Sequence, residues 1–400
     1  MGITHVLGRV FLLVWTAWLS PVQAAPYTPK SDSQVVGTLP FRANDNSARN
    51  LAVLRAAVAK DPNDPESAVL LAQQYFDLAM ARGDPRYVGY ANAVVDRFAG
   101  NLTAPLLLVR GTLRQYRHDF AAALDDYAAA LSGDADLAGA HAWRAAIYLV
   151  QARYDLANIE CQALQRLDRV VLYGGCAGMA LAYSGHLDQA YVTLQNALSL
   201  ARHDDHRLWL QTRLGEVAAW RGQPARAEAH FRRAVSLGQD DGYLLAAWSD
   251  FLLDQGRPAE VLKLLANWEA SDGLLLRLAE AEAVLKLPRA ATHIQTLDAR
   301  FAAAKSRGDT THRAEEARFQ LRLRGDAKQA AQLAAENYRI QREPRDARIA
   351  LEAALAVGDP NTAKDVQQWL LSSRFEDPRL RALDSQIALL RSTPPLGGKP

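Results

Sequence analysis

The sequence feature that most constrains the fold is a turn that returns about every 34 residues. Five segments share a glycine that is followed two residues later by Leu, Pro or Ala and five residues later by Ala or Val; they begin at Gly185, Gly222, Gly256, Gly325 and Gly358. Successive glycines are 37, 34, 69 and 33 residues apart, and 69 is close to two periods. Equivalent turns without glycine precede Phe120 and Tyr154, which are also 34 residues apart. Such a period indicates one supersecondary unit stacked on copies of itself.

Each period has the pattern of two helices. Small and large apolar residues recur at spacings of three and four, which places them on one helix face. The glycine suits the left-handed dihedrals that often end a helix, and the prolines that follow it suit the first turn of the next helix. The composition agrees, because Ala, Leu, Glu, Arg and Gln favour helices and β-branched residues are few. This excludes sandwiches, barrels and wholly disordered chains. We therefore expect an all-α chain of antiparallel helix pairs.

A small residue, an aromatic residue, a turn glycine and a following alanine at this period resemble the tetratricopeptide repeat. The resemblance implies an α-solenoid, a right-handed superhelix of about nine units at 65–99, 104–137, 138–170, 171–207, 208–241, 242–272, 273–308, 311–343 and 344–377. Because such repeats contact only their neighbours, we expect an elongated array without a central core. The 273–308 unit departs from the pattern, since Leu287 and Pro288 replace the glycine turn.

The two ends of the array are expected to differ from its middle. Residues 46–60 are predicted to form an N-terminal half-unit and residues 379–391 a C-terminal capping helix, because an end repeat otherwise exposes its stacking face. The solenoid with its caps therefore covers 46–391. Segments 25–45 and 392–400 are rich in Pro, Gly, Ser and Asn, which predicts flexibility.

The first 24 residues are predicted to be a signal peptide and not part of the fold. Arg9 precedes an apolar run from Val10 to Leu19, and small residues follow before a cleavage site ahead of Ala25. The run is too short to cross about 30 Å of hydrocarbon, so the mature chain is not expected to insert stably in a membrane. An uncleaved anchor is the alternative. No cysteine follows the run, which argues against a lipoprotein. We therefore predict an exported protein of the bacterial periplasm.

The only two cysteines are Cys161 and Cys176. Export makes a disulfide between them possible. In the repeat frame they belong to successive helix pairs, so a disulfide would join two neighbouring units. Two buried free thiols are the alternative.

The sequence carries no motif of a known catalytic class. It has no nucleophile elbow, phosphate loop, zinc-protease motif or dinucleotide fingerprint. The formal net charge is +2 without a basic block, which excludes a typical nucleic-acid binder. We expect neither catalysis nor a cofactor. His203 and His206 flank two aspartates and could hold Zn²⁺ or Cu²⁺, so a periplasmic metal-binding or metal-delivery protein is the alternative function. A solvated connector between repeats has the same composition.

The resemblance implies recognition of a partner along the concave face, which the first helix of each unit lines. Carrying the repeat frame across places nine side chains on that face: Tyr116, Met179, Tyr183, Trp209, Glu216, Trp220, Tyr243, Asp250 and Asp254. An aromatic strip with carboxylates beside it suits a basic or apolar segment of an envelope protein or peptide. The alternative is that the aromatic members pack between helices. The sequence therefore predicts a non-catalytic exported scaffold.

Overall fold

The computed structural model of the protein describes Ser31, Gln34 and residues 46–392. The chain divides into two compact units, Met1–Asn50 and Leu51–Pro400. The expected signal peptide, nearly all of the segment predicted to be flexible at 25–45, and residues 393–400 lie outside the described residues. Helix α1 (Asn46–Lys60) begins in the first unit, and the fold below is that of the second.

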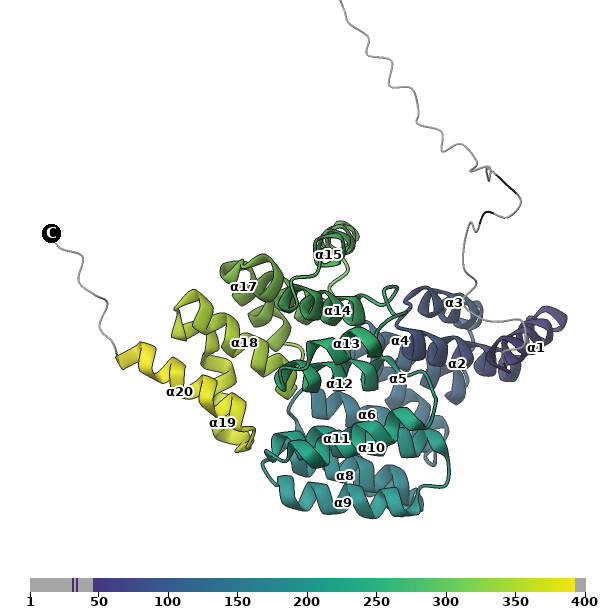
Figure 1. Cartoon of the computed structure of the whole chain (residues 1–400). Coiled ribbons are helices and arrows are strands. Elements are labelled where there is room, and N and C mark those ends of the chain that lie inside the picture. The colour runs from purple at the N-terminus through teal and green to yellow at the C-terminus, as the bar shows by residue number, and fades with distance from the viewer. Residues whose placement is uncertain (1–30, 32–33, 35–45, 393–400) are drawn as a thin grey trace, which may run out of the picture. The chain divides into compact units, whose positions relative to one another are not determined.

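The described residues from 65 to 373 form nine successive helix pairs and no strand (Figure 1). The pairs are α2 (Pro65–Arg82) with α3 (Arg86–Val95), α4 (Ala104–Tyr116) with α5 (Phe120–Gly133), α6 (Ala138–Val150) with α7 (Tyr154–Arg166), α8 (Val170–Tyr183) with α9 (Leu187–Leu200), α10 (Asp204–Trp220) with α11 (Pro224–Ser236), α12 (Gly242–Asp254) with α13 (Pro258–Leu264), α14 (Asp272–Val284) with α15 (Arg289–Ser306), α16 (Arg313–Phe319) with α17 (Ala327–Tyr338), and α18 (Pro344–Val357) with α19 (Lys364–Ser373). A π-helical turn, η2 (Gln320–Arg324), extends α16, a short 3-10 turn, η3 (Pro360–Ala363), precedes α19, and α20 (Pro378–Ser392) follows it. The predicted all-α solenoid is confirmed.

The turn inside a pair keeps one backbone geometry even where glycine is missing. The residue two positions before the second helix has positive φ at each glycine turn predicted from the sequence. His118 and Ala152 take the same conformation, with φ of 60° and 58°, and so does Lys286, three positions before α15, with φ of 55°. An L-residue there costs about 1–2 kcal/mol more than glycine, which packing of the helix pair offsets. Lys286 therefore explains how the irregular 273–308 unit still forms its turn.

Small residues in the first helix make room for aromatic side chains of the second. A Cβ added at Gly111 would lie 2.5 Å from Cε1 of Tyr127, and one at Gly215 would lie 2.7 Å from Cε1 of Phe231. Tyr127 and Phe231 are fully buried in these seats. The repeating glycine thus sets how closely the two helices of a pair approach.

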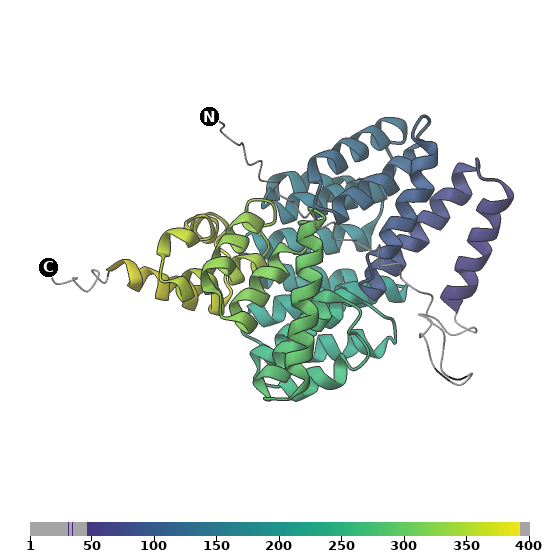
Figure 2. The ribbon, with the colours of Figure 1, turned by 90° about the horizontal axis from the view of Figure 1, so that it is seen from above.

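Units far apart in the sequence also touch, so the expectation of contacts between neighbours alone is wrong. The Arg342 N–H donates to the Val150 carbonyl at 2.7 Å, and Trp369 Nε1 donates to the Tyr154 hydroxyl at 2.7 Å. Arg82 pairs with Asp240 at 2.9 Å, where α2 meets the start of α12. Figure 2 shows the C-terminal pairs beside the earlier ones. Rotation accumulates along the array and returns later units to the inner face of earlier ones.

Candidate functional site

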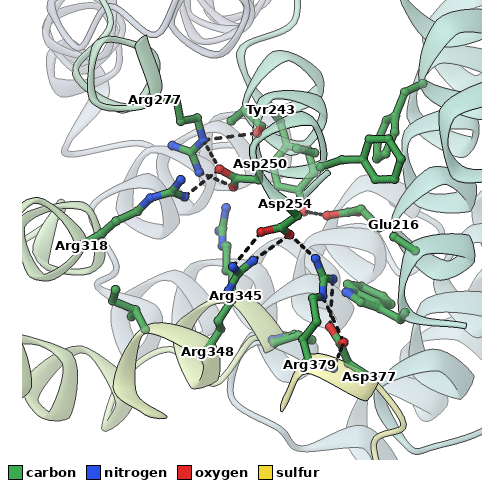
Figure 3. Close-up of a pocket in the computed structure, with 18 of the residues that line it drawn as sticks. Glu216, Tyr243, Asp250, Asp254, Arg277, Arg318, Arg345, Arg348, Asp377 and Arg379 are labelled. Atoms are coloured by element: carbon green, nitrogen blue, oxygen red, sulfur yellow. Dashed lines mark hydrogen bonds and ion pairs between the residues drawn. The ribbon is translucent and has the colours of Figure 1, made fainter. Parts of the chain in front are cut away.

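A cavity of ≈ 120 Å³ lies where the inner faces of α10, α12, α14, α16 and α18 meet the start of α20 (Figure 3). We call it the arginine–carboxylate pocket, because its charged lining consists of Arg277, Arg318, Arg322, Arg345, Arg348, Arg379, Glu216, Asp250, Asp254 and Asp377. Aromatic side chains (Trp220, Phe231, Tyr243 and Phe251) and aliphatic side chains complete the wall. Helices from several different repeat units therefore build one site.

Asp250 on α12 is held by arginines from two later units. Its Oδ2 pairs with Arg277 at 2.7 Å and its Oδ1 with Arg318 at 2.7 Å. Arg318 also forms a two-pronged pair with Glu280, with both N–O distances 2.6 Å. Burial alone would raise the pKa of Asp250, but attraction to Arg277 and Arg318 outweighs it and holds the pKa well below the ordinary value. Asp250 is therefore ionised at neutral pH.

Asp254, one turn further along α12, joins two more elements. Arg348 of α18 donates to both of its oxygens, at 2.8 and 2.7 Å. Arg379 of α20 also donates to Asp254, and it pairs with Asp377 at 3.0 Å. Two-pronged arginine–carboxylate pairs are directional as well as strong, so this cluster fixes α18 and α20 relative to α12.

Glu216 on α10 is the third carboxylate of the pocket that was predicted from the sequence. Its Oε1 accepts the Tyr243 hydroxyl at 2.7 Å, and its Oε2 accepts Arg213 at 2.9 Å. The Arg213 guanidinium lies 4.3 Å from the centre of the Tyr243 ring. Burial raises the pKa of Tyr243, so its hydroxyl keeps its proton and acts as a donor.

The lining holds six arginines and four carboxylates, and Glu280, Glu343 and Glu352 behind the lining pair with Arg318, Arg345 and Arg322. Each arginine of the lining is therefore paired with at least one carboxylate of the chain. The sequence predicted a basic or apolar partner because Glu216, Asp250 and Asp254 were expected to face it. Since all three are paired with arginines of the chain, they no longer support a basic partner. Among the described residues that line it, none is Ser, Cys, His or Lys, so the usual nucleophiles and near-neutral bases are missing.

Five of the nine side chains predicted for the concave face line this pocket: Glu216, Trp220, Tyr243, Asp250 and Asp254. The other four lie elsewhere. The Tyr116 ring packs edge-on against Phe76, and Met179 and Tyr183 are buried. A Cβ at Gly175 would lie 2.0 Å from Cη2 of Trp209, so that indole packs on α8. Tyr116, Met179 and Trp209 therefore match the packing alternative, whereas Tyr183 contacts Phe375 of the segment that follows α19.

The arginines were missed, although the repeat pattern held a signal for them. Arg277, Arg318 and Arg348 lie on the first helices of their units, where the same frame could have been continued beyond Asp254. The repeat pattern does not show that these units come together around α12.

Cys161 and Cys176 form a disulfide that joins α7 to α8, so the two cysteines link successive pairs. The rings of His203 and His206 are 6.1 Å apart, but the aspartates between them have other partners. Asp204 pairs with Arg207 at 3.0 Å, and Asp205 accepts from Gln239 at 3.0 Å. The described part of the chain contains no group of three or more potential His, Cys, Asp or Glu metal ligands. None of its helices is both long and apolar enough to be a membrane span.

No family model matches the chain, and no curated protein matches it. Solved structures with a similar fold include a tetratricopeptide repeat protein from Parabacteroides merdae, with 17% identity, a TM-score of 0.39, and coverage of 60% of this chain and 86% of that one. A Rap protein complexed with competence and sporulation factor has 14% identity, a TM-score of 0.46 and coverage of 86% and 94%. Yeast Tom70 has 14% identity, a TM-score of 0.36 and coverage of 80% and 62%. The fold itself is defined by the chain's own helix pairs.

Proposed function

We propose that this protein is an exported, non-catalytic scaffold of the bacterial periplasm that binds an acidic segment of another envelope protein at the arginine–carboxylate pocket. The observation that carries the proposal is the convergence of six arginines, from three repeat units and the start of α20, on one cavity. The apolar run and small residues at the start of the sequence support export. The disulfide between Cys161 and Cys176 supports an oxidising compartment.

The chemistry of the pocket favours a carboxylate as ligand. A guanidinium offers five donors in a planar fork that matches a carboxylate, and it stays charged at any physiological pH. Arginines such as Arg277, Arg318 and Arg348 are already held by carboxylates of the chain, so little of their side-chain entropy is lost when a ligand arrives. A volume of ≈ 120 Å³ is that of a few water molecules. It suits one acidic side chain or a chain terminus, with the rest of the partner lying along the neighbouring helices.

Non-catalytic action is supported by the composition of the same wall. The pocket's ionisable groups are arginines, carboxylates and one tyrosine. The pKa of Asp250 is lowered, so that this carboxylate is not poised to exchange a proton near neutral pH. Such a set recognises charge and shape.

Calorimetry with short acidic peptides and their Asn/Gln counterparts tests the proposal. Arg348→Ala should weaken the affinity for the acidic peptides by about ten- to a hundredfold, which is the effect of losing one charge-assisted hydrogen bond. Arg257→Ala is the matched control. Its side chain is 29% exposed against 25% for Arg348, and each pairs with two carboxylates, but Arg257 does not line the pocket. Equal losses in the two variants, or equal binding of the acidic and amide peptides, would contradict the proposal.

A further inference from the structure

The segment Ser373–Asp377, which links α19 to α20, lies on the inner face of much earlier repeats. Residues 374–377 are not helical. Phe375 is 2% exposed, and its ring centre lies 5.3 Å from Trp220, 5.4 Å from Trp369 and 6.5 Å from Tyr183. We call these three side chains the aromatic cage. Two of them, Tyr183 and Trp220, are residues that the repeat frame assigns to the concave face.

The backbone of the segment also packs closely against the earlier repeats. A Cβ added at Gly185, in the α8–α9 turn, would lie 2.6 Å from the Arg374 carbonyl oxygen and 2.7 Å from that of Ser373. Only glycine fits at that turn while the segment is in place. Arg374 itself has φ of 55°, an uncommon conformation for a residue other than glycine. The segment therefore follows the surface of the repeats at the cost of a strained residue.

The cage and the arginine–carboxylate pocket form one continuous surface. Trp220 lines the pocket and also contacts Phe375. Asp377, two residues after Phe375, is buried at the pocket wall, where Arg379 bridges it to Asp254. The segment thus places an aromatic ring in the cage and a carboxylate at the arginines.

We infer that this inner surface binds a partner segment in which an aromatic residue is followed two positions later by a carboxylate, and that Ser373–Asp377 occupies the surface when the partner is absent. The inference rests on the proposed function and deepens it by naming the ligand's chemistry. The internal segment is the evidence, because it shows which side chains the cage and the pocket accept together.

Exchange of the internal segment for a partner leaves the charged network in balance. Asp254 keeps Arg348 when Arg379 leaves, and Asp250 keeps both of its arginines. In the described part of the chain only α20 follows the segment, and it packs mainly on α18 and η3. The earlier helix pairs therefore do not need to unfold for the segment to move.

The test uses the full chain with Phe375→Ala, which empties the cage, and synthetic peptides of the sequence of residues 373–377. One peptide keeps Phe, a second has Ala in its place, and a third keeps Phe but has Gln and Asn for the two acids. Phe301→Ala is the control, since Phe301 is 5% exposed and packs on Phe319 away from the cage. The Phe375→Ala variant should bind the first peptide at least about tenfold more tightly than the second, because the phenyl ring refills a buried apolar site. Wild type and Phe301→Ala, in which Phe375 competes for the cage, should bind the first peptide more weakly than Phe375→Ala does.

A second measurement does not depend on the folding of a variant. In wild-type protein, excess of the first peptide should speed hydrogen exchange of the α20 amides by displacing the segment, and the Ala peptide should not. Equal binding of the first two peptides to Phe375→Ala, the same gain in Phe301→Ala, or unchanged exchange of α20 overturns the inference. If the Gln/Asn peptide binds Phe375→Ala as well as the acidic one does, the proposed carboxylate recognition fails while the aromatic preference stands.

Discussion

Removing the disulfide tests how the array is held together. The perturbation is Cys161→Ala with Cys176→Ala in the full chain. The bond joins residues 15 apart in the sequence, on the facing helices α7 and α8. In the chain-entropy account, a cross-link that closes a loop of about 15 residues stabilises the folded state by about 3 kcal/mol. Both cysteines are buried, so loss of their sulfur atoms adds to this value and does not offset it.

The structure predicts where the loss appears. In an array whose units contact only their neighbours, the effect stays near α7 and α8. Here Trp369 of α19 donates to the hydroxyl of Tyr154, the first residue of α7, so α19 should lose protection as well. Helices α14 and α15 do not contact α7 extensively and should change little.

Native-state hydrogen exchange measures each helix separately. A loss of about 3 kcal/mol corresponds to roughly a hundredfold faster exchange in α7 and α8. Wild-type protein refolded with a reductant keeps both sulfur atoms and isolates the effect of the cross-link. Unchanged exchange in α7 and α8 would refute the entropic argument. A loss confined to α7, α8 and their sequence neighbours would refute the coupling through Trp369.

Two further predictions concern buried charge. Asp250→Ala leaves Arg277 without its carboxylate, and we expect a loss of about 2–4 kcal/mol in the free energy of unfolding. The loss should be smaller than for a fully buried pair, because Asp250 is 25% exposed and Arg318 keeps Glu280. Urea denaturation measures it, and a loss below about 1 kcal/mol would contradict the prediction. Burial raises the pKa of Asp346 to about 7 from its ordinary 3.8, although Arg345 opposes the shift. Between these values the folded chain keeps a proton that the unfolded chain has lost, so stability should fall as pH rises from about 4 to 7, by at most about 4 kcal/mol. Asp346→Asn should flatten this slope, whatever its effect on absolute stability, and an unchanged slope would assign the pH dependence to other groups.

The candidate site was partly predictable from the sequence. The repeat frame placed Glu216, Asp250 and Asp254 on the same face of the array, and all three line the pocket, because successive units stack in register. It could not supply their arginines. Arg348 reaches Asp254 from a position 94 residues away, and such a meeting depends on contacts that no local pattern encodes.

A local pattern also could not predict that the aromatic residues of the inner face are covered. Tyr183 and Trp220 occupy the side of the helix that the frame assigns to them, but Phe375 covers both. A helical period determines which face a side chain is on. It does not determine whether another segment lies on that face.

By itself the sequence determined the local units of this protein: the helix pairs, the positive-φ turns and the small residues that seat Tyr127 and Phe231. These depend on interactions between residues less than one repeat apart, which a period of about 34 displays directly. The tertiary structure alone decided which charged side chains meet at the pocket and that Phe375 covers the aromatic cage. In repeat arrays each pair is rotated by a small amount relative to the one before, and the rotation adds over many units. The hydrogen bond from Tyr183 to Glu343, 160 residues away, exists only because of that sum.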